Sequence, residues 1–434
     1  MTRAGDQPVT RAHLDNGLEL RLKEMHTAPL ISSWLWYRVG SRNERPGTTG
    51  ISHWVEHMQF KGTPTFPAGV LDRAISRDGG AWNAGTWLDW TVYYETMPAG
   101  RIDLALDLEA DRMVNSLFEP AEVESERTVI ISEREGHENE PSFRLDEEVQ
   151  AAAFRVHSYH HEVIGDMADL HTITRDDLYR HYRQYYRPAN AVLALAGDFD
   201  TDDMLTRIRQ RFESLDGGLA PVFGPRSEPA QRGERQVVVE GPEETPILEV
   251  AYRAPEPTDP TFYALAVLDS ILSGASSFSP YGSGLSNKTS RLYRAMVEGG
   301  VAAAVSGGLA ATVDPYLYSV RATIRPGQSP ETALQVLDDE LARLQEAPIS
   351  ADEVSKAIKQ AKAIFAYDSE SISNQAFWLG YSEMFSDYSW FESYLNQIDQ
   401  VTPEALLQVA HQVLVPAQRV VGIFRPTEAS ANGN

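Results

Sequence analysis

Two histidines and a glutamate stand together in one short stretch, and their types and spacing could bind a metal. The stretch is residues 50–63, Gly-Ile-Ser-His-Trp-Val-Glu-His-Met-Gln-Phe-Lys-Gly-Thr, and it contains His53, Glu56 and His57. On an α-helix, residues three and four apart share a face. The two imidazoles could therefore bind one divalent cation, and the carboxylate could act on a metal-bound water.

The order His-x-x-Glu-His is the inverse of the common zincin motif. In a chain of this length, chance would produce it on the order of one time in a hundred at ordinary composition. The alternative is a helix whose histidines only make polar contacts, and a glutamate at this offset counts against that alternative.

A second stretch offers the third metal ligand. Residues 120–135 read as a helix that carries Glu126 and Glu133. The two glutamates are seven residues apart, which is two helical turns, so they lie on one face. Either of them could be the ligand. Acids on a single helix most often form only a solvated face, and this alternative stays open for each glutamate taken alone.

Three further histidines, His157, His160 and His161, fall within five residues of one predicted loop. They could form a second metal site. The loop lacks the helical spacing that would hold the rings together, and exposed histidines are common in loops.

Composition limits the class of protein. The chain has 434 residues, an apolar fraction of 42%, no cysteine and a net charge of −24. This length predicts two or more domains. Without cysteine, imidazoles and carboxylates are the remaining metal ligands. The negative charge argues against a nucleic-acid partner.

We find no run of eighteen apolar residues and no secretory signal, so we expect no membrane span and a cytoplasmic location, although the lack of cysteine would also suit an oxidising compartment.

The order of elements suggests alternating strands and helices. An Asn-Gly turn at 16–17 predicts a hairpin over 12–22, and Thr48 or Thr49 could cap the metal helix. Strands are expected over 29–38, over 191–196 and as a pair within 81–95, and helices over 67–77, 101–114, 120–135, 144–155 and 174–186.

The chain reads as a duplication. Thr174 and Pro188 have the same spacing as Thr402 and Pro416, and Leu178 matches Leu406 at the same offset. We therefore predict an α+β fold of two homologous domains, each a mostly antiparallel sheet covered by helices. The expected bounds are 1–218 for a catalytic zinc-binding domain, 219–233 for a Gly- and Pro-rich linker, 234–426 for a non-catalytic domain and 427–434 for a disordered tail.

Several stretches together resemble the pitrilysin–insulinase family of inverted-motif zinc peptidases, in the branch that includes the subunits of mitochondrial processing peptidase. The resemblance rests on residues 50–63, on Gly79-Gly80-Ala-Trp-Asn83-Ala84 and on Glu126-Arg-Thr-Val-Ile-Ile-Ser-Glu133. It also includes residues 157–165, followed by Tyr-Arg-Pro-Ala-Asn at 186–190. The match covers nearly the whole chain.

The resemblance implies a role for each of these positions. His53, His57 and Glu133 would bind one Zn²⁺ per chain, Glu56 would be the catalytic base and Glu126 would support the site. Asn83 and Ala84 would lie on a strand that receives the peptide. The chain would form half of a clamshell.

One departure from the family pattern concerns the second half of the chain. Active assemblies of the family usually carry an Arg and a Tyr seven residues apart after a Ser-Arg-Leu-(Phe/Tyr) turn. Here the turn is residues 290–293, but the two positions hold Val297 and Ala304, which cannot donate a side-chain hydrogen bond. We therefore expect a heterodimer with a homologous subunit that supplies the pair. A homodimer, or substitution by Arg291 and Tyr293, is the alternative.

The leading hypothesis is thus a zinc endopeptidase that cuts unfolded peptides or small polypeptides as the zinc-bearing subunit of a dimer. One alternative is a non-catalytic core or scaffold subunit of the same fold, like those of respiratory complexes. The intact His53, Glu56, His57 and Glu133 argue against it. Another is a metal-dependent hydrolase that acts on a substrate other than peptide.

Overall fold

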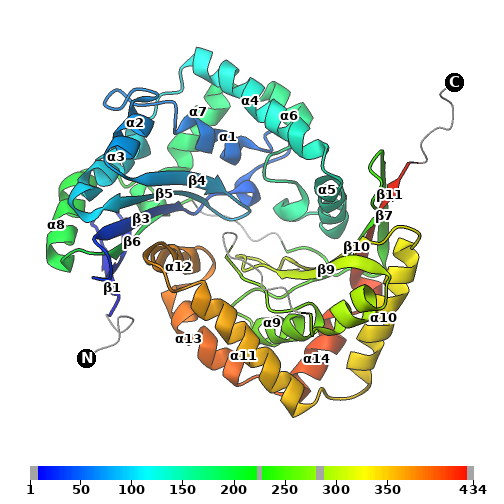
Figure 1. Cartoon of the computed structure of the whole chain (residues 1–434). Coiled ribbons are helices and arrows are strands. Elements are labelled where there is room, and N and C mark those ends of the chain that lie inside the picture. The colour runs from blue at the N-terminus through cyan, green and yellow to red at the C-terminus, as the bar shows by residue number, and fades with distance from the viewer. Residues whose placement is uncertain (1–7, 222–226, 280–287, 428–434) are drawn as a thin grey trace. The chain divides into compact units, whose positions relative to one another are not determined.

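The computed structural model describes residues 8–221, 227–279 and 288–427 (Figure 1). Residues 222–226 of the predicted linker and 428–434 of the predicted tail lie outside the described residues. Thr427, which was predicted to begin the tail, donates its backbone N–H to the carbonyl of Gly241 at 2.6 Å.

The chain divides into two compact units that are not continuous in sequence. One consists of Met1–Arg134, His161–Arg226 and Ser369–Phe391, and the other of Glu135–His160, Ser227–Asp368 and Glu392–Asn434. The break between Arg226 and Ser227 falls within the expected linker 219–233, and each unit also includes a segment from the other half of the sequence.

The first unit contains a six-stranded sheet in the order β1-β2-β6-β3-β5-β4. All neighbours are antiparallel except β2 and β6. Its strands are β1 (Thr10–His13), β2 (Glu19–Glu24), β3 (Leu30–Tyr37), β4 (Ala81–Thr86), β5 (Thr91–Pro98) and β6 (Ala191–Gly197).

The second unit contains a five-stranded sheet in the order β7-β11-β8-β10-β9, again with one parallel pair, β7 and β11. Its strands are β7 (Arg235–Gly241), β8 (Ile247–Arg253), β9 (Ala302–Leu309), β10 (Leu317–Ile324) and β11 (Arg419–Pro426). The order matches β2-β6-β3-β5-β4 strand for strand. The predicted α+β class with two mostly antiparallel sheets is confirmed.

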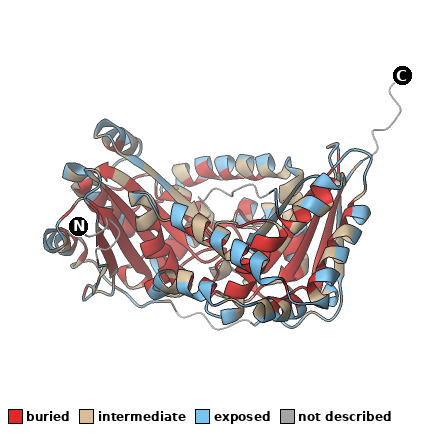
Figure 2. Cartoon of the chain, turned by 60° about the horizontal axis from the view of Figure 1, so that its bottom comes forward, coloured by how far each residue is buried: buried red, intermediate tan, exposed pale blue. Residues whose placement is uncertain are grey.

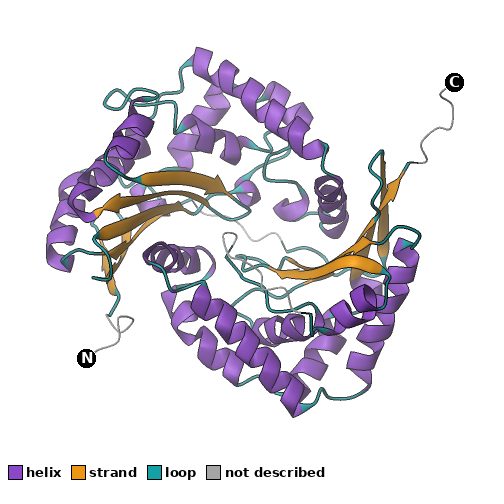
Figure 3. Cartoon of the chain, viewed as in Figure 1, coloured by secondary structure: helices purple, strands orange, loops and turns teal. Residues whose placement is uncertain are grey.

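Helices account for most of the remaining chain (Figure 3). Among the described residues, no helix combines the length and the apolar character needed to cross a membrane. The helices are α1 (Ile51–Met58), α2 (Val70–Arg77), α3 (Ile102–Asn115), α4 (Pro120–Glu138), α5 (Pro141–Ala153), α6 (Met167–Thr172), α7 (Arg175–Tyr185), α8 (Thr201–Phe212), α9 (Pro260–Leu272), α10 (Pro330–Glu346), α11 (Ala351–Tyr367), α12 (Ile372–Phe385), α13 (Tyr388–Asp399) and α14 (Pro403–Val413).

The local signals in the sequence explain several of these elements. Gly17 adopts a φ of 92° in the turn between β1 and β2, a conformation that glycine adopts without steric cost. Thr174 and Thr402 cap α7 and α14, because each side chain accepts a hydrogen bond from the backbone N–H three residues later. The hairpin, the strands over 29–38, 81–95 and 191–196 and the five predicted helices are all present, with shifts of a few residues at their ends.

Each sheet is packed by one helix from the opposite half of the sequence. Helix α12 packs on β3 and β6 of the first sheet, and α5 packs on β7, β8 and β11 of the second. On α12, a Cβ added to Gly380 would lie 2.2 Å from the Trp36 ring, so only glycine allows this close approach. On β11, a Cβ added to Gly422 would lie 2.4 Å from Val149 of α5. Complementary small and large residues therefore fix both helices.

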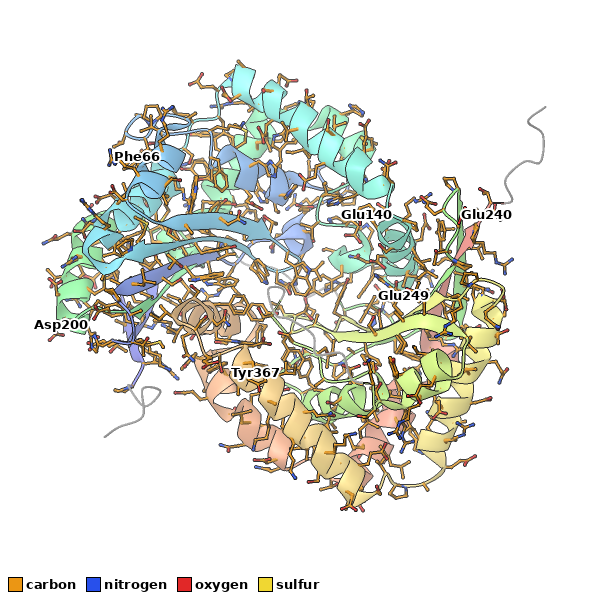
Figure 4. The ribbon with its side chains drawn as sticks, viewed as in Figure 1. Phe66, Glu140, Asp200, Glu240, Glu249 and Tyr367 are labelled. Carbon is orange, nitrogen blue, oxygen red and sulfur yellow. The ribbon has the colours of Figure 1, made fainter. Side chains whose placement is uncertain are left out.

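The core of each unit lies between its sheet and helices. Figure 2 shows the central strands of both sheets as largely buried, while many helices have one buried and one exposed face. A polar contact also joins α5 to the second sheet: Arg321 of β10 lies 3.0 Å from Glu249 of β8 and also pairs with Asp146 of α5. Glu249 is labelled in Figure 4.

Candidate metal centre

The imidazoles of His53 and His57 and the carboxylate of Glu133 converge at one point in the first unit. The two Nε2 atoms are 3.2 Å apart. The Oε2 atom of Glu133 lies 3.9 Å from Nε2 of His53 and 3.7 Å from Nε2 of His57. Among the described residues, this is the only group of three or more such side chains that could hold a metal ion.

The donor set and its dimensions fit zinc. Two atoms bound to one tetrahedral zinc at about 2.0–2.1 Å stand about 3.3 Å apart. The separation of the two Nε2 atoms meets this value, and the two distances to Glu133 exceed it by only a few tenths of an ångström. Two nitrogens and one carboxylate oxygen also match the ligands of known catalytic zinc sites, which keep a fourth position open.

The beginning of α1 is held by a buried carboxylate. Oxygens of Glu44 accept hydrogen bonds from the backbone N–H groups of Gly50 and Ser52, both at 2.8 Å. These are N–H groups that a helix leaves unpaired at its start, where the helix dipole favours negative charge. The prediction that Thr48 or Thr49 caps this helix was wrong. The N-cap residue is Gly50, with a φ of 84°, and the carboxylate of Glu44, which precedes the helix in sequence, accepts the hydrogen bonds.

Glu44 is itself held by His161, whose Nε2 lies 2.9 Å from the carboxylate with both side chains almost fully buried. Burial acts to lower the pKa of His161, but the hydrogen bond and charge of Glu44 outweigh it and raise the pKa. The loop after α5 thus fixes the helix that carries the two predicted ligands.

Glu126 supports His57 from the side opposite the metal position. Its Oε1 lies 2.8 Å from Nδ1 of His57, and its other oxygen pairs with Lys61. A carboxylate on Nδ1 fixes the tautomer, so that the lone pair of Nε2 faces the metal position. Burial acts to lower the pKa of His57, but the bond to Glu126 and the nearby carboxylates raise it. Burial acts in turn to raise the pKa of Glu126, and the bonds to His57 and Lys61 lower it.

Glu56 lies beside the metal ligands in a largely dehydrated position. Burial raises the pKa of its carboxyl to about 7, against the lowering effect of a hydrogen bond from Thr86. The hydroxyl of Thr86 donates to Oε2 of Glu56 at 2.7 Å. A carboxyl with a pKa near neutrality can both accept and return a proton.

Asn83 and Ala84 lie on β4, which pairs only with β5 among the described strands and therefore forms an edge of the first sheet. Asn83 is exposed, and its Oδ1 accepts a hydrogen bond from the backbone N–H of Ala84 at 2.9 Å. A peptide strand that used this N–H would have to displace the side-chain amide.

Helix α4, which carries both glutamates, is held in place by Arg127. This guanidinium donates to the carbonyl of Ile173 at 2.9 Å and to that of Leu170, and it lies 4.7 Å from the centre of the Trp54 ring of α1. The contacts fix α4 against α1, so that the carboxylates of α4 face the imidazoles.

The three loop histidines bind separate partners and do not form a second metal group. Nε2 of His157 lies 3.1 Å from Asp314, His160 contacts the carbonyl of His157, and His161 pairs with Glu44. These contacts give His157 and His161 structural roles.

In the second unit, Val297 is buried in the π-helical segment Tyr293–Glu298, and Ala304 is exposed on the edge strand β9. Arg291 forms a bidentate pair with Glu353, with distances of 2.8 and 2.7 Å. This pairing occupies the guanidinium in a structural contact and counts against Arg291 as a substitute for the missing arginine.

The sequence reading missed Glu44, Lys61 and Thr86. Lys61 lies in the same stretch as the two histidines, and Thr86 lies only two residues after Ala84. Their proximity in sequence was the available signal, but their contacts depend on packing.

Comparisons with known proteins agree with this arrangement. Residues 21–167 match the profile described as "Insulinase (Peptidase family M16)", and residues 172–361 match "Peptidase M16 inactive domain". A relative from Mycobacterium leprae named "Uncharacterized zinc protease" is 30% identical over 417 residues, covering 94% of this chain and 89% of that protein. The chain belongs to the insulinase family, peptidase family M16.

Two further similar proteins extend the comparison. The crystal structure of a protease from Helicobacter pylori has a TM-score of 0.89 and 26% identity, and covers 97% of this chain and all of that one. An Arabidopsis thaliana protein named "Probable mitochondrial-processing peptidase subunit beta" is 29% identical over 270 residues, covering 61% of this chain and 50% of its own length. The resemblance inferred from the sequence is confirmed at the level of the family.

Proposed function

We propose that this chain is a zinc-dependent endopeptidase that hydrolyses peptide bonds in unfolded peptides or small polypeptides. The observation that carries the proposal is the convergence of two imidazole Nε2 atoms and one carboxylate beside a buried glutamate. Relatives named zinc proteases support the same activity class.

In this proposal, His53, His57 and Glu133 hold one Zn²⁺, and Glu126 orients His57 through its Nδ1. When bound, zinc supplies Lewis acidity at the scissile carbonyl and acidifies water. Glu56 accepts the proton of the attacking water and then donates it to the nitrogen of the leaving amine. The burial that brings the pKa of Glu56 to about 7 suits it to both transfers.

The edge of β4 would align the substrate. An extended peptide can add to an open strand edge through main-chain hydrogen bonds, which are insensitive to sequence. Asn83 and Ala84 lie on this edge, and Thr86 at the end of the same strand contacts Glu56. We therefore expect loose sequence preference and a strong preference for unfolded segments.

A homologous partner would complete the site. Val297 and Ala304 offer no side-chain donor, and Arg291 is engaged by Glu353. Removing one donor to a developing oxyanion typically costs about 3 kcal/mol of transition-state stabilisation. We propose a heterodimer whose second subunit supplies an Arg/Tyr pair, with a homodimer as the alternative. The relative named as a subunit of a processing peptidase supports a paired assembly.

The central test is hydrolysis of a quenched fluorescent peptide library by zinc-loaded protein, with Glu56→Gln as the inactive comparison. We expect zinc-dependent cleavage by the wild type, and we expect the variant to keep its zinc while losing turnover. If the Glu56→Gln variant still hydrolyses the peptides, Glu56 is not the catalytic base.

The partner is tested separately by measuring turnover of this chain alone and together with a co-expressed homologous chain that carries the Arg/Tyr pair. We expect the pair to co-purify and to raise kcat by about 100-fold, the effect of one oxyanion donor. Full activity of this chain alone would refute the need for a partner.

A second candidate is a non-catalytic scaffold subunit of the same fold. It is favoured by the match of residues 172–361 to the inactive-domain profile and by the apolar residues at 297 and 304. Absence of zinc in the purified complex, together with no cleavage in the presence of the partner, would favour this candidate.

A further inference from the structure

Thr86 is the one side chain that we find hydrogen-bonded to Glu56 among the described residues. Its hydroxyl donates to Oε2 at 2.7 Å, whereas none of the hydrogen bonds of the described residues involves Oε1. The two oxygens of the carboxylate are therefore not equivalent in the folded protein.

In the ionised form of Glu56, which is the form that can act as a base, a count of hydroxyl hydrogens gives the direction of this bond. Thr91, the cross-strand neighbour of Thr86, donates its single hydrogen to the carbonyl of Val39 at 2.9 Å. In the 3.3 Å contact between the two threonine oxygens, Thr91 can therefore only accept. The hydrogen of Thr86 is left with two acceptors, and the carboxylate is both closer and charged.

Thr86 also belongs to the last position of β4, the edge strand on which the proposed function places the peptide. Its backbone is fixed by pairing with β5, and Thr91 on that strand is fully buried. A rigid sheet, and not a mobile loop, thus supplies the group that touches the predicted base.

We propose that Thr86 is a positioning residue that holds Oε2 of Glu56 and so leaves Oε1 as the oxygen that accepts the proton. The inference rests on the proposed function, because it assigns an orienting partner to the same base. It further implies that the position of the base is tied to the strand that receives the substrate. Without the hydroxyl, either oxygen could turn toward the reacting water, and productive orientations would be less populated.

The test compares Thr86→Val, which keeps the shape but removes the hydroxyl, with Thr86→Ser, which keeps the hydroxyl. For Thr86→Val we expect kcat to fall by about 10- to 100-fold, the effect of removing a hydrogen bond to a charged group. We expect KM and zinc affinity to stay within about 2-fold, and we expect Thr86→Ser to restore kcat to within about 3-fold of the wild type.

The matched control is Thr96→Val on β5 of the same sheet, whose hydroxyl contacts Ser32 and Ser373 and not Glu56. This variant should leave kcat unchanged. An equal loss of kcat in Thr86→Val and Thr96→Val would overturn the proposal, because it would show a general response of the sheet to the loss of a hydroxyl.

A second readout does not require turnover. The infrared carboxyl band of Glu56 can be identified by its loss in Glu56→Gln, and it should shift in Thr86→Val and not in Thr86→Ser or Thr96→Val. An unshifted band, or a kcat of Thr86→Val within 3-fold of the wild type while Glu56→Gln is inactive, would overturn the inference alone. Turnover that survives Glu56→Gln would instead overturn the proposed function.

Discussion

The helix that follows β3 and the helix that follows β8 hold the same place in two sheets of equivalent strand order, but they bury different residues. Helix α1 buries Glu56 and places His53 and His57 at partly exposed positions. Helix α9 is buried at every position from Phe262 to Leu272. Three of these residues, Tyr263, Asp269 and Ser270, have a side chain that can form hydrogen bonds, and the others are apolar.

The same contrast recurs where α7 and α14 pack. His181 and Val409 each lie seven residues after the capping threonine of their helix, and both are buried. One half therefore carries an imidazole where the other carries an aliphatic side chain. The comparison teaches that a duplicated scaffold can retain its packing in both copies although buried positions of equivalent helices differ in polarity, as His181 and Val409 do.

The largest effect should come from removing the carboxylate of Glu56 from α1, since α9 has no metal-ligand histidines beside its buried carboxylate. Glu56→Gln should lower kcat by about 10²- to 10⁴-fold, the usual contribution of a general base, while the zinc content stays at one per chain. Steady-state kinetics and metal analysis measure both quantities. Glu404→Gln on an exposed turn of α14 is the matched control and should have no effect. Comparable losses in the two variants would mean that charge, and not the base, is responsible.

Removal of the metal should abolish activity and reduce stability through the first unit, which carries His53 and His57. A chelator should abolish cleavage, and at free zinc of about 1,000 times Kd, restoring the ion should stabilise the fold by about 4 kcal/mol. Thermal melts with and without zinc measure this difference. His57→Ala should lose the zinc-dependent shift, whereas His411→Ala on the exposed face of α14 should keep it. A shift of equal size in both variants would place the metal elsewhere.

The contrast between His181 and Val409 predicts a pH effect on stability. Burial lowers the pKa of His181 to about 3, from 6.5 in the unfolded chain. Between these values the unfolded state binds a proton that the folded state does not, so the contribution is present above pH 6.5 and is lost as the pH falls toward 3. Between pH 6.5 and 4.5 the loss should reach about 2 kcal/mol, because each pKa unit is worth 1.36 kcal/mol and half of the unfolded-state histidine is already protonated at pH 6.5.

The measurement is the urea midpoint at pH 7 and at pH 4.5 for the wild type and for His181→Gln, which can still bond to Ser52. The variant should lose less stability on acidification than the wild type. Equal losses in the two proteins would show that His181 binds its proton in the folded state and does not contribute to the pH dependence of stability.

The smallest effect should come from the arginine of the second half. Because Arg291 and Glu353 form a partly exposed pair, Arg291→Ala should cost about 1 kcal/mol of stability and leave kcat unchanged. Denaturant titration and steady-state kinetics measure these quantities. A 100-fold fall in kcat without loss of stability would make Arg291 a catalytic donor and would remove the reason for a partner.

Local signals predicted much of the fold. The Asn-Gly turn, the strands over 29–38 and 191–196 and the five predicted helices depend on neighbouring residues, and the structure contains each of them. The exchange of α5 and α12 between the sheets was not predicted. It depends on contacts such as Gly380 with Trp36, which lie hundreds of residues apart and leave no periodic signal.

The candidate site shows the same division. The spacing of His53 and His57 required only helical geometry, so the sequence revealed it. The cap by Glu44 and the bond from Thr86 join different elements, and no local rule relates their positions. The second metal site suggested by the loop histidines is not present, because closeness in sequence did not bring their rings to one point.

By itself, the sequence determined that two imidazoles share a helical face and that Glu126 and Glu133 share another. Their spacing of two turns makes both glutamates equally able to approach the histidines. Only the packing of α4 against α1 decided that Glu126 meets Nδ1 of His57 and that Glu133 meets the paired Nε2 atoms. The physical reason is that helical periodicity sets the direction of a side chain, whereas the offset between two helices, fixed by contacts such as Arg127 with Trp54, sets what it reaches.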